Sequence, residues 1–111
     1  MSDTAAIRRQ LKIKSGSAKR LYKEHRSYQR EEEDLKRKLD GFRASGAEDW
    51  DINNARRMME ESAKMVTDTA SRLGVIVQEL REIILSAEKD PALAEDEDMM
   101  KAKETLEEVS I

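Results

Sequence analysis

Apolar residues recur at alternating steps of three and four through the second half of the chain. Between residues 52 and 87 this spacing selects eleven positions, of which nine are apolar. They are Ile52, Ala55, Met59, Ser62, Val66, Thr69, Leu73, Ile76, Leu80, Ile83 and Ala87. Such a spacing places its members along one face of an α-helix. The pattern therefore predicts a long helix with a single apolar seam.

The first part of the chain carries a second seam of the same length. Between residues 7 and 42 the same steps select eleven positions, eight of them apolar: Ile7, Leu11, Lys14, Ala18, Leu21, His25, Tyr28, Glu32, Leu35, Leu39 and Phe42. Two seams of equal length indicate two helices that pack side by side. A short turn between them makes the helices antiparallel neighbours.

Glycine, proline and capping residues predict where the two long helices begin and end. We expect the first helix over residues 4–45, with Gly46 as its terminal residue. We expect the second over residues 51–89. Its cap is Asp49 or Asp51, the side-chain oxygen of which accepts from a first-turn N–H. If Asp51 is the cap, Trp50 is placed for a hydrophobic staple against the first turn.

A third, shorter helix is predicted over residues 91–109. Pro91 stops the second helix and opens the third, with Asp90 as its cap. Its seam is Glu95, Met99, Ala102, Leu106 and Val109. Since this helix starts where the second ends, it should cover residues 73–87 and 7–21. The second helix carries additional apolar residues there: Val75, Val77, Ile84 and Leu85.

Composition agrees with a bundle that has little interior. Charged residues make up 41% of the 111 residues and aromatic residues 4%, which is typical of helices with mostly wet faces. We expect an all-α, elongated antiparallel three-helix bundle that forms a single domain over residues 1–111. The half of the hairpin beyond the third helix then keeps a partly uncovered, methionine-bearing seam, which suits protein docking.

Charge is unevenly distributed along the chain. Residues 1–30 carry nine Lys or Arg against Asp3 and Glu24, a net charge of +7, whereas residues 88–111 carry nine acidic residues against three Lys, a net charge of −6. An acidic third helix is therefore expected to face the basic start of the first. The chain has no cysteine, no signal-peptide pattern and no apolar run of membrane-spanning length. We expect a cytoplasmic protein that does not engage a membrane.

The sequence gives little support for a catalytic site, a metal site or a nucleic-acid-binding surface. The single histidine, His25, falls on the seam of the first helix, where a packing or register role is favoured. Four oxygen-bearing residues (Asp49, Asp51, Asn53 and Glu60) have calcium-loop spacing, but position 6 of such a loop requires glycine and holds Asn54. The basic run has too few aromatic residues for base stacking. We predict no enzyme activity, no metal, no cofactor and no nucleic-acid partner.

Short sequence blocks at a fixed separation resemble the tubulin-binding cofactor A (tubulin-specific chaperone A) family. They are Leu11-Lys12-Ile13-Lys14-Ser15-Gly16, Lys19-Arg20-Leu21, Lys23-Glu24, Tyr28, Asp51-Ile52, Glu61-Ser62, Met65, Asp68 and Arg72-Leu73. The similarity covers roughly residues 8–85. Where the family often has Met-Ile-Pro-Asp, this chain has Met65-Val66-Thr67-Asp68, and threonine is compatible with an unbroken helix where proline would kink it.

The resemblance implies a fold and a client. Family members are three-helix bundles that capture β-tubulin after the cytosolic chaperonin and hold it, without nucleotide, for assembly with α-tubulin through further tubulin-folding cofactors. This chain is accordingly expected to be an ATP-independent, microtubule-related chaperone, present as a monomer or weak homodimer.

Two groups of residues are predicted to bind the client. Because tubulin is acidic, the basic face of the first helix would steer its approach: Lys12, Lys14, Lys19, Arg20 and Lys23. Tyr28, Met58 and Met65 would supply the desolvated contact. Glu61, Ser62, Asp68 and Arg72 are carried over by resemblance as contact or orienting residues, and a helix–helix packing role is open for each.

Two functions of other classes compete with this interpretation. One is a coiled-coil adaptor or homodimeric scaffold that pairs its uncovered seam with a second copy, which equilibrium sedimentation detects. The other is an RNA-binding helix, which predicts steep salt dependence of polyanion binding.

Overall fold

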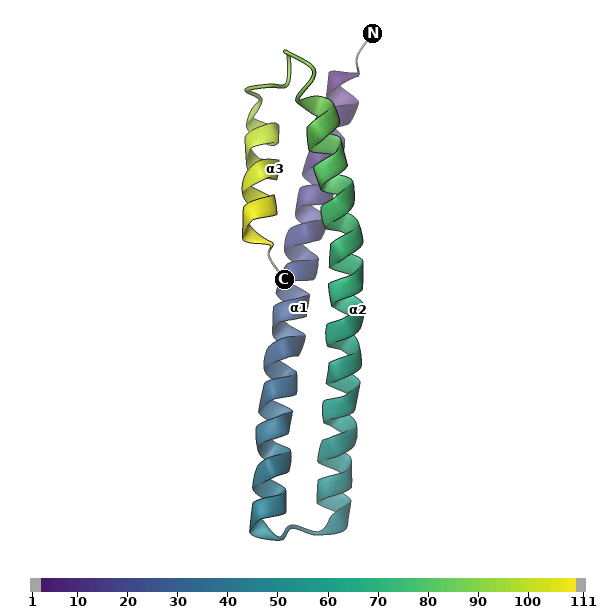
Figure 1. The fold of residues 1–111 in the computed structure, drawn as a ribbon, viewed down its shortest axis with the longest axis vertical. Helices are drawn as coiled ribbons and strands as arrows, with labels where there is room; N and C mark the ends of the chain where they lie inside the picture. The colour runs from purple at the N-terminus through teal and green to yellow at the C-terminus, as the bar shows by residue number, and fades with distance from the viewer. Residues whose placement is uncertain (1–2, 110–111) are drawn as a thin grey trace. The chain divides into compact units, whose positions relative to one another are not determined.

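The computed structural model describes residues 3–109, and these fold into three α-helices (Figure 1). They are α1 (Thr4–Ser45), α2 (Asp49–Ala87) and α3 (Glu97–Glu108), with no strand within residues 3–109. The all-α, three-helix prediction is confirmed. Of the predicted domain over residues 1–111, residues 1–2 and 110–111 lie outside the described residues.

The chain forms two compact units, through both of which α1 and α2 run. The three-helix unit comprises Met1–Tyr22 and Ser71–Ile111, and the two-helix unit comprises Lys23–Ala70. Within the described helices, none has the length and apolar character needed to cross a bilayer.

The two predicted seams are the packed faces of α1 and α2. All eleven seam positions of each helix are buried or half-buried. The helix α1 continues through Gly16, and α2 continues through Thr67, as the sequence predicted. Thr67 donates its hydroxyl to the carbonyl of Ala63 at 3.3 Å, which satisfies the side chain inside the helix.

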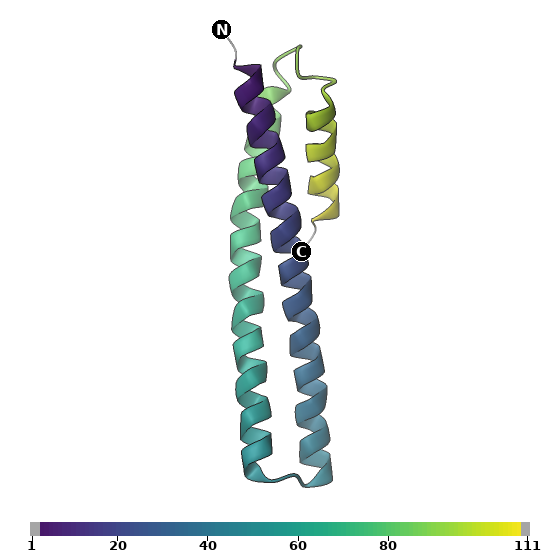
Figure 2. The same cartoon turned by 180° about the vertical axis from the view of Figure 1, so that it is seen from behind.

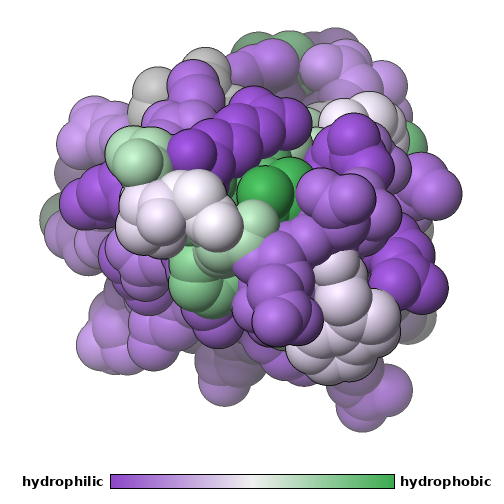
Figure 3. Space-filling model, turned by 90° about the horizontal axis from the view of Figure 1, so that it is seen from below, coloured by the Kyte–Doolittle hydropathy of each residue, from purple (hydrophilic) through white to green (hydrophobic). Residues whose placement is uncertain are grey.

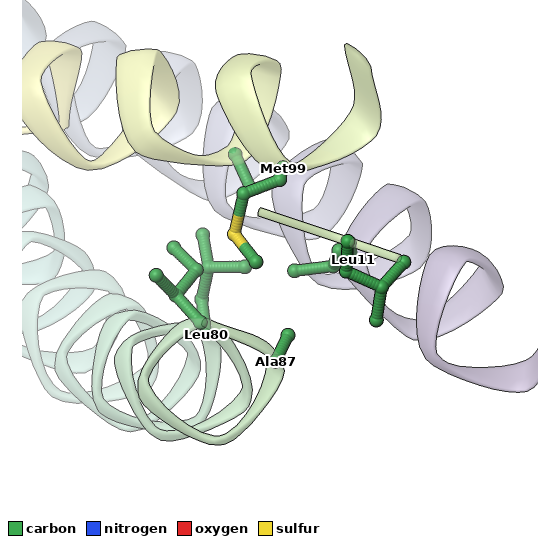
Figure 4. Close-up of a cluster of buried hydrophobic side chains, with 7 residues drawn as sticks. Leu11, Leu80, Ala87 and Met99 are labelled. Atoms are coloured by element: carbon green, nitrogen blue, oxygen red, sulfur yellow. The ribbon is translucent and has the colours of Figure 1, made fainter. Parts of the chain in front are cut away.

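In the three-helix unit, α3 closes a core over the first part of α1 and the last part of α2 (Figures 1 and 2). The side chain of Met99 points from α3 toward Leu11 of α1 and Leu80 of α2 (Figure 4). All three are fully buried. A second cluster joins Val109 to α1 and α2 through Ala18, Leu21 and Leu73. The predicted position of the third helix over residues 7–21 and 73–87 is therefore confirmed.

Opposite charges also join α3 to α1. Arg8 Nε donates to Asp96 Oδ1 at 2.8 Å, and Lys12 Nζ lies 3.7 Å from Asp98 Oδ2. Asp96 is the N-cap of α3 and accepts from the Asp98 N–H at 2.9 Å. A basic start to α1 and an acidic start to α3 therefore meet in this unit, as their charges predicted.

The third helix begins later than predicted, and its seam differs. Residues 88–96 form turns, in which the Leu93 N–H donates to the Asp90 carbonyl at 2.9 Å. This turn folds Leu93 into the core, where it is fully buried, while the predicted seam residue Glu95 is exposed. The assignment of Asp90 as the helix cap is wrong, because Asp96 followed by two acidic residues starts the helix.

Two further corrections concern α2. The helix begins at Asp49, so that Trp50 lies in its first turn with 69% of its surface exposed and is not a staple preceding the helix. Val75 and Leu85 were expected among the packed residues but are 58% and 57% exposed. Only Val77 and Ile84 of that set turn toward the core, because Val75 and Leu85 project from the far side of the helix.

The two-helix unit is a hairpin closed by Gly46. This residue has φ +69°, and the N–H groups of Gly46 and Ala47 donate to the carbonyls of Arg43 and Phe42, which forms a Schellman motif. Gly46 therefore ends α1, as predicted. Figure 3 looks onto this end, where small apolar patches lie among mostly hydrophilic side chains.

His25 forms a buried polar link across the two-helix unit. Its side chain lies on the α1 seam with 2% exposed, and Nδ1 is 3.0 Å from Thr69 Oγ1 on α2. The Thr69 hydroxyl donates to the Met65 carbonyl at 2.8 Å, so its oxygen accepts from the His25 ring. The link fixes the register of the two helices, which agrees with the packing role predicted for His25.

Thr69→Val is expected to lower the free energy of unfolding by about 1–3 kcal/mol, because it leaves the buried His25 N–H without its acceptor. The matched control is Thr67→Val on the same helix, which removes an exposed hydroxyl bonded only to its own turn. Urea unfolding measures both. Equal, small effects of the two changes would show that the His25–Thr69 bond does not stabilise the fold.

The Arg8–Asp96 pair predicts acid sensitivity of α3. Partial burial raises the pKa of Asp96, but hydrogen bonds from Arg8 and from the Asp98 N–H outweigh it and hold the pKa below the ordinary value of 3.8. The folded state therefore binds the proton less readily than the unfolded state. This contribution to stability is present above pH 3.8 and is lost as the pH falls through the lowered value.

Acid titration followed by NMR is expected to show weaker docking of α3 in the wild type as the pH falls through this range. Asp96→Asn, which lacks the carboxylate charge, should show weakened docking already at neutral pH. Glu97→Gln is the control, because the ion pair of Glu97 with Lys101 is exposed to solvent. An acid transition of α3 that is unchanged in Asp96→Asn would contradict the assignment.

Candidate functional site

A hollow of about 170 Å³ opens between α1 and α2 in the two-helix unit. It is lined by Tyr28, Glu31, Met58, Glu61, Ser62 and Met65. Five of the six are among the twelve predicted client-binding residues, and the structure brings them together at one place. Glu31 is the lining residue that the sequence did not single out.

Helical spacing explains why these side chains converge. Met58 and Met65 are seven residues apart and therefore lie two turns apart on the same side of α2. Ser62 lies on the seam between them and is buried, so that it belongs to the helix–helix contact as well as to the hollow. Tyr28 approaches from the α1 seam. Met58 is 45% exposed, which leaves its thioether accessible to a partner.

The chemistry of this hollow suits a protein partner. Two unbranched thioethers and a phenol ring give an adaptable apolar floor. The carboxylates of Glu31 and Glu61 lie at its exposed margin. The hollow therefore combines an apolar floor with two carboxylates at its margin.

A second hollow, of about 330 Å³, lies in the three-helix unit. Ser17, Arg20, Leu21, Arg72, Val75 and Ile76 line it. Two of the predicted residues, Arg20 from α1 and Arg72 from α2, thus meet at one site. The sequence predicted both residues but gave no sign that they share a hollow, because this depends on the register of α1 against α2.

The largest of the three hollows, of about 480 Å³, was not predicted. It also lies in the three-helix unit and is lined by Ala6, Ile7, Gln10, Lys14, Glu79, Glu82, Ile83, Ser86 and Ala87. Lys14 and Glu79 form an ion pair there. In the sequence, Ile7 and Ile83 could be recognised only as seam residues. In the structure they are partly buried and pack against the edge of the core.

The predicted basic residues do not form one uniform face. Lys12 pairs with Asp98 of α3, and Lys14 with Glu79 of α2. Lys19 and Lys23 are exposed. Part of the positive charge of α1 is therefore neutralised within the three-helix unit. The remaining predicted residue, Asp68, is exposed on α2. Lys19, Lys23 and Asp68 line none of the three hollows.

Within residues 3–109, no group of three or more His, Asp or Glu residues is arranged to hold a metal ion. The calcium-loop spacing between residues 49 and 60 falls inside α2, and a helix is incompatible with a coordinating loop.

The described residues thus form a small three-helix bundle with hollows between its packed helices. A family model described as tubulin binding cofactor A matches residues 6–106, and the chain belongs to this family. It is 36% identical over 103 residues to the human protein named tubulin-specific chaperone A, with 93% of each chain covered. It is 30% identical over 101 residues to tubulin-folding cofactor A of Arabidopsis thaliana, covering 91% of this chain and 88% of the relative.

Solved structures of the same family share the fold. The crystal structure of tubulin folding cofactor A from Arabidopsis thaliana superposes with a TM-score of 0.85 at 30% identity, covering 95% of this chain and 96% of the other. Human tubulin chaperone cofactor A superposes with a TM-score of 0.80 at 31% identity, covering 95% and 99%. The family resemblance seen in the short sequence blocks is thereby confirmed.

Proposed function

We propose that this protein is a tubulin-folding chaperone that captures β-tubulin by stoichiometric binding, without ATP. It then holds β-tubulin for assembly with α-tubulin through other tubulin-folding cofactors, in the cytoplasm and in association with microtubules. The observation that carries the proposal is the family match over residues 6–106. The relatives named tubulin-specific chaperone A and tubulin-folding cofactor A support it over nearly their full lengths.

The hollow of the two-helix unit is the proposed desolvated contact with the client. Tyr28, Met58 and Met65 give it an apolar floor, and thioethers repack readily against different surfaces. Lys19 and Lys23 are exposed and steer an acidic client by long-range attraction that salt weakens. Glu61 and Asp68 orient the bound client.

The experiment is a pull-down of purified α- and β-tubulin by the immobilised chain, with and without ATP. The proposal predicts that β-tubulin is retained in preference to α-tubulin, at one copy per chain, and that ATP changes neither amount. Retention of neither tubulin would remove the proposal. Retention that requires ATP would contradict the stoichiometric mechanism.

The competing function is a homodimeric scaffold, which the exposure of Met58 in the two-helix unit also favours. In that case a second copy covers the hollow. Equilibrium sedimentation at micromolar concentration distinguishes the two, since the scaffold predicts a stable dimer and the chaperone predicts a monomer or weak homodimer. We further propose that residues 1–111 act as one domain, since α1 and α2 each run through both units.

A further inference from the structure

We infer that the hollow of the two-helix unit binds an arginine side chain that projects from an amphipathic helix of the client. In this arrangement the guanidinium group donates hydrogen bonds to Glu31, Glu61 and Ser62. The aliphatic stem of the arginine lies against the thioethers of Met58 and Met65. The identity of the client as tubulin rests on the proposed function, whereas the chemical class of the bound side chain rests on this hollow alone.

Two carboxylates at this hollow are available to a partner. Glu31 stands on α1 and Glu61 on α2, and both are exposed. Within residues 3–109, neither side chain forms an ion pair or a hydrogen bond. No lysine or arginine is among the described residues that line the hollow with them. The two unpaired negative charges therefore favour a cationic partner.

Ser62 supplies a third acceptor, from the seam between the helices. Its side chain is only 3% exposed, yet its hydroxyl forms no hydrogen bond within the described part of the chain. The hydroxyls of Thr67 and Thr69 on the same helix, in contrast, each donate to the carbonyl one turn earlier. Since Ser62 lines the hollow, its oxygen gains a hydrogen bond when an N–H group of a partner enters.

The rest of the lining selects a long side chain over a small cation. A volume of about 170 Å³ is roughly six times the share of one water molecule in the liquid, so that it admits one long side chain. Met58 and Met65 offer apolar surface to an aliphatic stem, and the Tyr28 ring attracts a guanidinium group. Arginine suits these groups better than lysine, because its planar head carries five N–H donors and stacks on aromatic rings.

The exposed part of the hollow explains why the arginine should stand on an amphipathic helix. Met58 is 45% exposed, so that apolar surface remains beside the carboxylates after one side chain has entered. A helix places an apolar residue one turn away from the arginine, on the same face, where it covers this thioether.

A basic contact residue is compatible with a client that is acidic as a whole. The exposed Lys19 and Lys23 act on the net charge of the client at long range, and salt screens this attraction. The hollow, in contrast, acts on a single side chain at contact distance. The two groups of residues therefore recognise different features of one client.

An NMR titration with synthetic peptide helices tests the inference without tubulin. The probe carries an arginine with a leucine one turn later, and its control carries citrulline, which has nearly the same shape without the charge. With the ¹⁵N-labelled full chain we expect peptide-induced shifts at residues 28–31 and 58–65. The citrulline peptide should bind about 10-fold more weakly or worse. Absence of arginine-peptide binding, shifts elsewhere, or equal affinities of the two peptides would overturn the inference.

Two matched charge reversals locate the site. Glu61→Lys should weaken binding of the arginine peptide about 10-fold or more, because it replaces an acceptor in the hollow with a like charge. Glu60→Lys changes the net charge equally, one residue away and outside the hollow, and should weaken binding less than about threefold. Both residues are exposed, and circular dichroism checks that helix content is unchanged. Equal losses in the two variants would contradict the inference.

Ser62→Ala tests the hydroxyl separately. Because this hydroxyl forms no hydrogen bond within residues 3–109, its removal should not lower the free energy of unfolding, which urea denaturation measures. Binding of the arginine peptide should nevertheless weaken about threefold or more. A loss of stability with unchanged peptide affinity would contradict the place of Ser62 in the site.

Binding of β-tubulin to the same variants separates this inference from the proposed function. Peptide binding that depends on Glu61, without any tubulin binding, would support the arginine site and reject the tubulin client. Tubulin binding by the wild type that Glu61→Lys and Glu60→Lys weaken equally would reject the arginine site and leave the chaperone proposal standing.

Discussion

Replacing Leu80 with alanine is expected to lower the free energy of unfolding by about 2–5 kcal/mol. Leu80 is fully buried in the three-helix unit, where it contacts the core formed with Leu11 and Met99 (Figure 4). The change removes apolar surface from the core and leaves a cavity that three helices cannot readily close. Urea denaturation followed by circular dichroism measures the loss.

The matched control is Leu85→Ala, a little more than one turn farther along the same helix. Leu85 is 57% exposed, so the same chemical change should cost less than about 0.5 kcal/mol. Similar losses in the two variants would contradict the observed orientation of α2. Native-state hydrogen exchange adds a test of the single-domain proposal, because Leu80→Ala should then also speed exchange within Lys23–Ala70.

Replacing Met58 with glutamate is expected to weaken β-tubulin binding roughly 30-fold. The thioether of Met58 lies at the proposed contact. A carboxylate there adds negative charge beside Glu31 and Glu61, and burying it without a positively charged partner costs free energy. Because Met58 is partly exposed, the fold should tolerate the change. Surface plasmon resonance with immobilised chain measures the dissociation constant.

Met100→Glu is the control for this prediction. Met100 is an exposed methionine on α3, and it lines none of the three hollows. The same substitution there should change the dissociation constant less than about threefold. Should Met100→Glu weaken binding as much as Met58→Glu, the contact would not lie at the two-helix hollow.

The architecture was predictable because each seam of 36 residues repeats the same spacing of three and four residues at eleven positions. The two seams assign α1 and α2, and every position in them is buried or half-buried. Connectivity and charge then placed the third helix, and the Arg8–Asp96 pair agrees with that reasoning. The turn was predictable as well, because Gly46 supplies the positive φ that ends α1.

The start of α3 and the outer face of α2 were not predictable in the same way. Asp90 and Asp96 are both good caps, and the choice between them depends on Leu93 reaching the core, which is a tertiary contact. Val75 and Leu85 look like core residues by hydropathy alone. Their exposure shows that the buried face of α2 extends beyond the seam only as far as Val77 and Ile84, and the seam spacing alone does not determine that width.

The candidate site was also predictable only in part. Spacing along α2 placed Met58, Ser62 and Met65 on one side of the helix, and in the structure they line one hollow together with Tyr28. Contacts between helices were missed. The Lys14–Glu79 ion pair removes one lysine from the predicted basic face, and it depends on the register of α1 against α2.

Hydrogen–deuterium exchange of the full chain, alone and with β-tubulin, tests most directly whether the two-helix unit holds the client. The account predicts slower exchange at residues 28–31 and 58–65 on adding β-tubulin, and no such change on adding α-tubulin. Protection confined to Glu97–Glu108, or exchange that β-tubulin leaves unchanged throughout, would contradict it.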